Sequence, residues 1–148
     1  MIKKMMVALD GSKPANRALD FALDLASKYS SEVLLLTVIQ PIAIPYFIYE
    51  EMPTPIESDT YSKRLEEYYK KLLSKALEKV KKEKPKLKAS SKIEEGRPAD
   101  KIVQIATEEE CDIIIMGSQG LSGVKELLLG SVSDRVADKA TCPVLIVK

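Results

Sequence analysis

Apolar residues in this chain form short continuous runs that alternate with stretches of helical spacing. Residues 5–9, 33–39 and 113–116 are almost entirely apolar and have the length of strands. Such runs are typical of parallel strands that helices cover on both faces. In residues 87–93, Leu87, Ala89, Ser91 and Ile93 alternate with Lys88, Ser90 and Lys92. This alternation predicts an edge strand with one solvated face.

Four stretches between these runs place apolar residues three and four positions apart, as on one face of a helix. The first follows Ser12, an expected N-cap, and has Pro14 in its first turn. The third spans about 98–110, and the fourth begins at Ser131, with Asp134 in a capping-box-like position. The apolar stripes of the first three are Ala15, Ala18, Leu19, Ala22, Ala26 and Tyr29, then Tyr61, Leu65, Tyr68, Tyr69, Leu72, Ala76 and Val80, then Ile102, Val103 and Ala106.

The alternation of strands and helices predicts one α/β domain over residues 1–148, built on an open five-stranded parallel sheet with helices on both faces. The long second helix and the edge-like third strand favour the order 3-2-1-4-5. In that order, ligands bind in the crevice between strands 1 and 4, at their carboxyl ends. Asp10 and Gly117 close these two strands, so both are expected at the crevice.

Composition excludes several classes of function. Lys and Arg number 23 against 22 Asp and Glu, so no overall basic charge favours nucleic acid or an anionic membrane. The chain has no histidine, which removes the usual general base near neutral pH. No apolar run approaches the roughly 18 residues of a membrane span, and Cys111 and Cys142 suit small core positions in a reducing compartment. We therefore expect a soluble cytoplasmic protein.

Glycines after the fourth strand give the clearest chemical signal. Gly117, Gly120, Gly130 and Ser131 have the spacing G-x2-G-x9-G-S, which is neither the P-loop nor the Rossmann spacing. A buried strand that leads through a glycine-rich loop to a helix start can hold phosphate on backbone N–H groups. An ordinary turn and a plain helix cap explain these residues singly, whereas together they favour an anion site. Lys125 and Arg97 are expected at the solvated surface.

Two further residues have open alternatives. Asp10 is either a turn residue or a ligand of ribose hydroxyls or a divalent cation. Val38 is either plain core or a residue whose backbone N–H and C=O bond an adenine edge. Residues 40–57 are rich in proline yet apolar, which is compatible with a lid, a partner-contact arm or a loop folded back on the core.

The motifs together resemble a universal stress protein domain of the nucleotide-binding kind, over essentially the whole chain. The resemblance rests on Val7-Ala-Leu-Asp10-Gly-Ser12, Val38, Glu95-Gly-Arg-Pro98, Asp112-Ile-Ile-Ile-Met-Gly-Ser118, Gly130-Ser-Val132 and Cys142-Pro-Val-Leu-Ile-Val147. The G-x2-G-x9-G-[ST] element is similar to the family's ATP-binding signature. Gln119 stands where many members have histidine, which weakens any proposal of a catalytic side chain there.

The resemblance implies an adenine nucleotide alpha hydrolase-like fold that binds ATP, with Mg²⁺ or Mn²⁺ held through the phosphates. We expect a regulatory switch that is at most a weak ATPase, because the chain offers no His, no P-loop Lys and no clearly placed base to activate water, and we expect occupancy to order the loop between Gly120 and Gly130. The binding residues that the resemblance implies are Ala8, Leu9, Asp10, Val38, Met116, Gly117, Ser118, Gly120, Gly123, Gly130, Ser131, Val132 and Ser133. The alternatives are an ATP-using enzyme of a related fold and a scaffold that binds no nucleotide.

The last strand predicts self-association. Residues 144–147 are apolar and would lie at the outer edge of the sheet, where an uncovered edge promotes aggregation. Antiparallel pairing of Val144 to Val147 with the same strand of a second copy would cover it and give a two-fold homodimer, as the family resemblance also implies. The sequence predicts no nucleic acid or membrane partner and leaves any protein partner unidentified.

Overall fold

The computed structural model describes residues 1–41, 58–119 and 129–148, and these residues form a parallel sheet with helices on both faces. Its strands are β1 (Lys4–Ala8), β2 (Glu32–Ile39), β3 (Ala89–Glu95), β4 (Ile113–Gly117) and β5 (Val144–Val147). They pair in parallel in the order β3-β2-β1-β4-β5. The predicted fold class and strand order are therefore confirmed.

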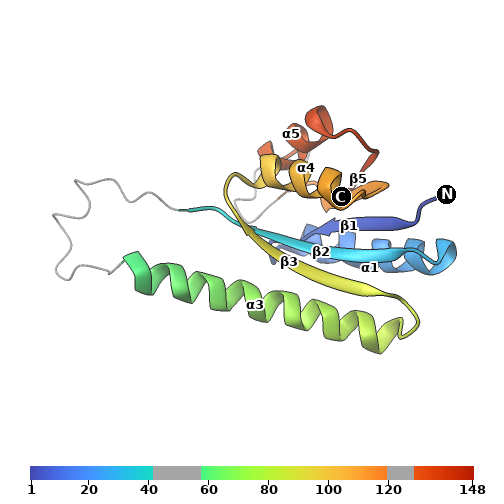
Figure 1. Cartoon of the computed structure of the whole chain (residues 1–148), viewed down its shortest axis with the longest axis horizontal. Helices are drawn as coiled ribbons and strands as arrows, with labels where there is room; N and C mark the ends of the chain where they lie inside the picture. Colours follow the sequence, from blue (N-terminus) through green and yellow to red (C-terminus); the bar gives the residue numbers. More distant parts are fainter. Residues whose placement is uncertain (42–57, 120–128) are drawn as a thin grey trace.

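The helices of the described residues are α1 (Lys13–Tyr29), α3 (Ser58–Glu83), α4 (Pro98–Glu108) and α5 (Ser131–Lys139). Figure 1 shows α3 on one face of the sheet and α4 with α5 on the other. The central strands β1, β2 and β4 are largely apolar because alternate side chains enter different cores, whereas β3 is polar and partly or fully exposed, as predicted for an edge strand. Met5 and Val7 of β1 pack with α1 and α3, whereas Met6 packs with α4 and α5.

Helix starts follow the predicted chemistry in one of two cases. Ser12 caps α1, since its Oγ accepts a hydrogen bond of 3.3 Å from the backbone N–H of Ala15. The capping box predicted for Ser131 and Asp134 is wrong. Gly130 is the N-cap of α5, and since glycine has no side chain it makes no side-chain cap hydrogen bond.

Three details of the helical stripes also differ from the sequence prediction. Tyr29 and Tyr68 are about half exposed, whereas Leu23 and Leu73 are buried. The buried face of α3 is therefore rotated away from Tyr68 towards Leu73. The helix α4 ends at Glu108 rather than near residue 110. The side chain of Tyr61, which was also predicted to lie on the apolar stripe, is outside the described part of the chain.

Candidate functional site

A cavity of about 710 Å³ opens at the carboxyl ends of β1, β2 and β4. It lies where the strand order reverses, between β1 and β4, which is the ligand-binding position of open parallel sheets. Ten of the predicted site residues line it: Ala8, Leu9, Asp10, Val38, Met116, Gly117, Gly130, Ser131, Val132 and Ser133. Gly120, Gly123 and Lys125 lie outside the described residues, as does the segment 42–57.

One wall of the cavity is apolar. Ala8, Leu36, Val38 and Met116 come from neighbouring strands and belong, with Ile102 of α4, to the core between the sheet and α4. These side chains offer a surface without charge, which suits a planar apolar group such as a nucleobase.

The peptide groups of Val38 face the cavity side of β2. The carbonyl of Leu36 accepts from the Leu9 N–H on the β1 side, at 2.8 Å, and that of Ile39 accepts from the Gly96 N–H on the β3 side, at 3.0 Å. The N–H and C=O of one strand residue point to the same side, and those of the next residue point to the other side, so the N–H and C=O of Val38 point towards β1. The register pairs Ala8, the last residue of β1, with Leu36, so Val38 extends beyond the end of β1.

The N-terminus of α5 forms the opposite end of the cavity. Gly130 and the first helical residues, Ser131 to Ser133, line it. The N–H groups of the first three helical residues have no partner within the helix, and the helix dipole places partial positive charge there. This part of the cavity is therefore suited to an anion.

Ser118 does not line the cavity, unlike its predicted neighbours. Its carbonyl instead accepts hydrogen bonds from the Gly130 N–H, at 2.7 Å, and from the Ser133 hydroxyl, at 3.0 Å. Ser118 thus joins the end of β4 to the start of α5 and fixes the position of that helix start.

Asp10 is a turn residue, as one of its two predicted alternatives had it, and its position at the cavity leaves the ligand role a prediction. Its Oδ1 accepts a 2.9 Å hydrogen bond from the Ser12 N–H, as in an Asx-turn, and the residue also lines the cavity. It is the one acidic residue among the described lining residues, which include no Lys or Arg. Arg97 is exposed and lies outside the lining, as predicted.

Gly117 has a packing role that the sequence motif did not reveal. A Cβ on this residue would lie 2.7 Å from the backbone carbon of Pro14 and 2.8 Å from the Ala15 nitrogen. The end of β4 therefore approaches the first turn of α1 too closely for any side chain. At this point the backbones of the two elements that flank the crevice approach each other directly.

Several lining residues were missed by the sequence analysis. Gln40 and Pro41 follow β2, Pro98 begins α4, and Leu65 and Tyr69 come from α3. The position of Gln40 and Pro41 at a strand end was a usable signal, since ligand sites gather there. Leu65 and Tyr69 gave no such signal in the sequence, because whether they face the cavity depends on how α3 is rotated against the sheet.

Comparison with known proteins identifies the family. A model of the universal stress protein family matches residues 1–148. The chain belongs to this family. Universal stress protein YxiE of Bacillus subtilis is 35% identical over 155 residues, which cover all of both chains.

Two solved structures of similar proteins agree with this assignment. The structure of MJ0577, a universal stress protein of Methanocaldococcus jannaschii, has a TM-score of 0.70 and 35% identity and covers 100% of this chain and 96% of its own. A universal stress protein of Archaeoglobus fulgidus, solved in complex with dAMP, has a TM-score of 0.66 and 26% identity, and the match covers all of both chains. A universal stress protein with the same fold thus binds an adenine nucleotide.

Proposed function

We propose that this universal stress protein binds ATP and acts as a nucleotide-dependent regulatory switch with slow or no hydrolysis. The observation that carries the proposal is the cavity between β1 and β4, where an apolar wall and a helix N-terminus meet. The dAMP complex of the Archaeoglobus protein supports an adenine nucleotide as the ligand.

The geometry suggests how the nucleotide lies. The adenine packs against Ala8, Val38 and Met116, and its edge bonds the backbone of Val38. The phosphates then extend to the N–H groups at the start of α5. We assign Leu9 to the packing, and Gly117 and Ser118 to holding the phosphate end in place through Pro14 and Gly130.

The residues present fit a hard divalent cation, Mg²⁺ or Mn²⁺, held mainly by the ligand itself. The described residues contain no group of three or more potential metal ligands, and Asp10 is the one carboxylate lining the cavity. Asp10 would hold the ion together with phosphate oxygens. The ion supplies positive charge that neutralises the phosphates.

Slow hydrolysis follows from the polar groups of the cavity. The chain has no histidine, and Gln119 lines the cavity next to the first glycines. Asp10 already accepts the Ser12 N–H, and an amide is a poor base. The described lining therefore holds and orients a nucleotide but offers little to activate water.

The first test is the identity of any small molecule released when freshly purified protein is denatured. ATP or ADP near one per chain supports the proposal. A protein that is empty and also fails to bind added Mg·ATP overturns it and leaves a non-nucleotide scaffold. Turnover of many ATP molecules per second would instead indicate an enzyme.

A substitution at Ser131 tests the phosphate end without harming the helix. Ser131 is exposed and is the first residue of α5, where a carboxylate stabilises a helix. Ser131→Asp should nevertheless weaken ATP binding about tenfold or more, because it adds a negative charge beside the phosphates. Ser131→Asn is the neutral control of matched size, and equal affinity of the two variants counts against the pose.

We also propose a cytoplasmic homodimer that pairs Val144 to Val147 with the same strand of a second copy. β5 is an edge strand whose four residues are all partly exposed. None of the described helices is long and apolar enough to cross a membrane.

A further inference from the structure

The helix α3 supplies a wall of the cavity that lies outside the glycine motif. Leu65 and Tyr69 line the cavity and stand one helical turn apart. Leu72 and Leu73, the next turn of the same helix, pack with the core between the sheet and α1. The wall therefore continues the packed face of α3 beyond the sheet and into the cavity.

The ring of Tyr69 is supported by its neighbour. Tyr68 and Tyr69 contact each other edge to face, with ring centroids 5.2 Å apart and an interplanar angle of 75°. This is a favourable geometry for two aromatic rings. Tyr68 also lies against the turn that follows β1, because its hydroxyl is close to Gly11.

Gly11 lets α3 approach the turn that carries Asp10. Its φ is +86°, and a Cβ there would lie 2.8 Å from Leu72 Cδ1 and 3.2 Å from the Tyr68 hydroxyl. The turn thus packs directly on α3, without a side chain between them. The turn that carries Asp10 and the helix that carries Tyr69 therefore lie next to each other, and both residues line the cavity.

The α3 wall has the chemistry of a nucleoside contact rather than a phosphate contact. Its two lining residues, Leu65 and Tyr69, carry no charge, whereas Glu66 and Lys70 pair with each other on the exposed side of the helix, at 2.8 Å. The anion-binding end of the cavity is formed by α5 instead. An aromatic ring and an aliphatic side chain suit a base or a ribose.

We infer that Tyr69 is a specificity-determining residue whose ring contacts the nucleoside part of the bound nucleotide. The inference rests on the proposed function and adds to it a residue on α3 that recognises the nucleoside. The Tyr69 ring favours ligands with a nucleoside over phosphate compounds that lack one. Affinity for the phosphate chain alone does not depend on Tyr69.

Calorimetric titration of the full chain tests this inference, with Mg·ATP and Mg·tripolyphosphate as the two probes. Tyr69→Leu keeps an apolar side chain but removes the ring, so ATP should bind about tenfold more weakly, the scale of a lost base–aromatic contact. Tripolyphosphate affinity should stay at the wild-type value. Tyr69→Phe keeps the ring and should bind ATP nearly as the wild type does.

Tyr29→Leu is the control, because Tyr29 is a helical tyrosine that lies outside the cavity lining. Equal loss of both probes in Tyr69→Leu, or no loss of ATP binding, overturns the inference and leaves the proposed function standing. Failure of the wild type to bind ATP overturns the proposed function itself.

Tyrosine fluorescence gives a second measurement that does not depend on the folding of Tyr69→Leu. The chain has six tyrosines and no tryptophan, so its emission reports tyrosine alone. ATP should quench part of this emission in the wild type, and Tyr69→Phe should lose that part while still binding ATP. Equal quenching in both proteins contradicts the contact.

Discussion

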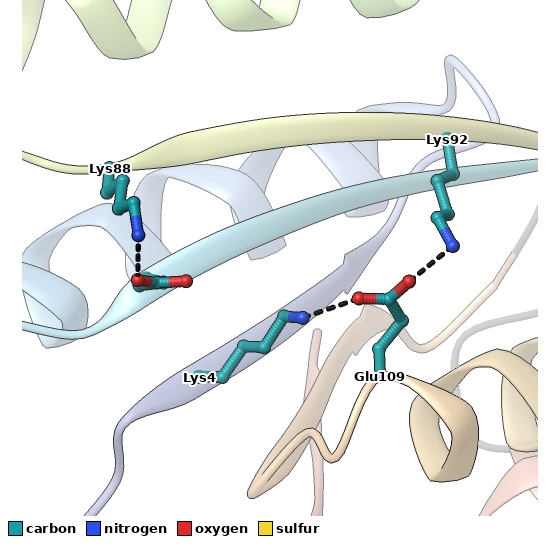
Figure 2. Close-up of polar contacts among 5 residues, drawn as sticks. Lys4, Lys88, Lys92 and Glu109 are labelled. Atoms are coloured by element: carbon teal, nitrogen blue, oxygen red, sulfur yellow. Dashed lines mark hydrogen bonds and ion pairs between the residues drawn. The ribbon is translucent and has the colours of Figure 1, made fainter.

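At the scale of single residues, a large change in acidity lies outside the cavity lining, at Glu109, which follows the last residue of α4. Figure 2 shows Lys4 of β1 and Lys92 of β3 bonding the two carboxylate oxygens of Glu109. The Lys4 Nζ lies 2.5 Å from Oε2. The hydrogen bonds from Lys4 and Lys92 lower the pKa of Glu109 from its ordinary 4.5 to about 2.

This lowered pKa predicts a loss of stability in acid. Because the folded protein holds Glu109 ionised, its contribution is fully present above pH 4.5 and disappears as the pH falls through about 2. The difference in unfolding free energy between the wild type and Glu109→Gln should therefore shrink over this range. Urea unfolding at successive pH values measures it.

Glu108→Gln is the control for the Glu109 experiment, since Glu108 accepts from the Gln104 side chain and leaves both lysine contacts intact. A difference between wild type and Glu109→Gln that stays constant from pH 4.5 to about 2 would contradict the role of the two lysines.

Some cavity residues can be predicted from their neighbours in the sequence, whereas others depend on contacts with distant parts of the chain. Asp10 and Gly130 could be placed from the sequence, because strand ends and helix starts are marked by nearby residues. Tyr69 could not be assigned to the cavity from the sequence, since the direction of its side chain depends on how α3 is rotated against strands distant in the sequence. The reason for glycine at position 117 also depends on a distant contact, with Pro14.

At the scale of elements, the contact between the end of β4 and the start of α1 predicts a cost for any side chain at Gly117. Gly117→Ala should lower the unfolding free energy by about 1–3 kcal/mol, because the added Cβ meets backbone atoms that cannot rotate away. Urea denaturation measures this loss.

Gly130→Ala is the matched comparison for Gly117→Ala. A Cβ at Gly130 would lie 3.2 Å from the Ser118 carbonyl oxygen, which is tight but not blocked. We expect a smaller loss there, and an equal or larger loss would show that the contact with Pro14 is not what requires glycine at 117.

The order and direction of the elements could be predicted because continuous apolar strands between amphipathic helices favour one kind of layered fold. Their finer placement could not. Leu72 and Leu73 are adjacent in α3, and the sequence alone does not say which of them turns fully inward. The cap of α5 was misassigned for a similar reason, since Gly130 takes the N-cap position and its N–H donates to the Ser118 carbonyl just after β4.

At the scale of the whole molecule, the β5 edge provides the geometry for pairing two copies. The carbonyl of Pro143 accepts from the Ile114 N–H of β4, at 3.0 Å, and that of Val147 accepts from the Ser118 N–H just after β4, at 2.9 Å. Since the N–H and C=O of one residue share a side and successive residues alternate, the N–H and C=O of Val144 and Ile146 face outward. An edge that presents unpaired N–H and C=O groups is a template for another strand.

Ile146→Pro tests the proposed dimer through this outward edge. Proline removes the N–H of residue 146, which points away from β4, so the bonds between β4 and β5 are kept. Light scattering at micromolar concentration should give twice the chain mass of 16.4 kDa for the wild type and for Ile146→Val, and the single chain mass for Ile146→Pro. A wild-type protein of single mass contradicts the dimer. If Ile146→Pro is still a dimer, the interface lies elsewhere on the protein, because loss of this N–H donor on both copies would weaken an antiparallel pairing of β5.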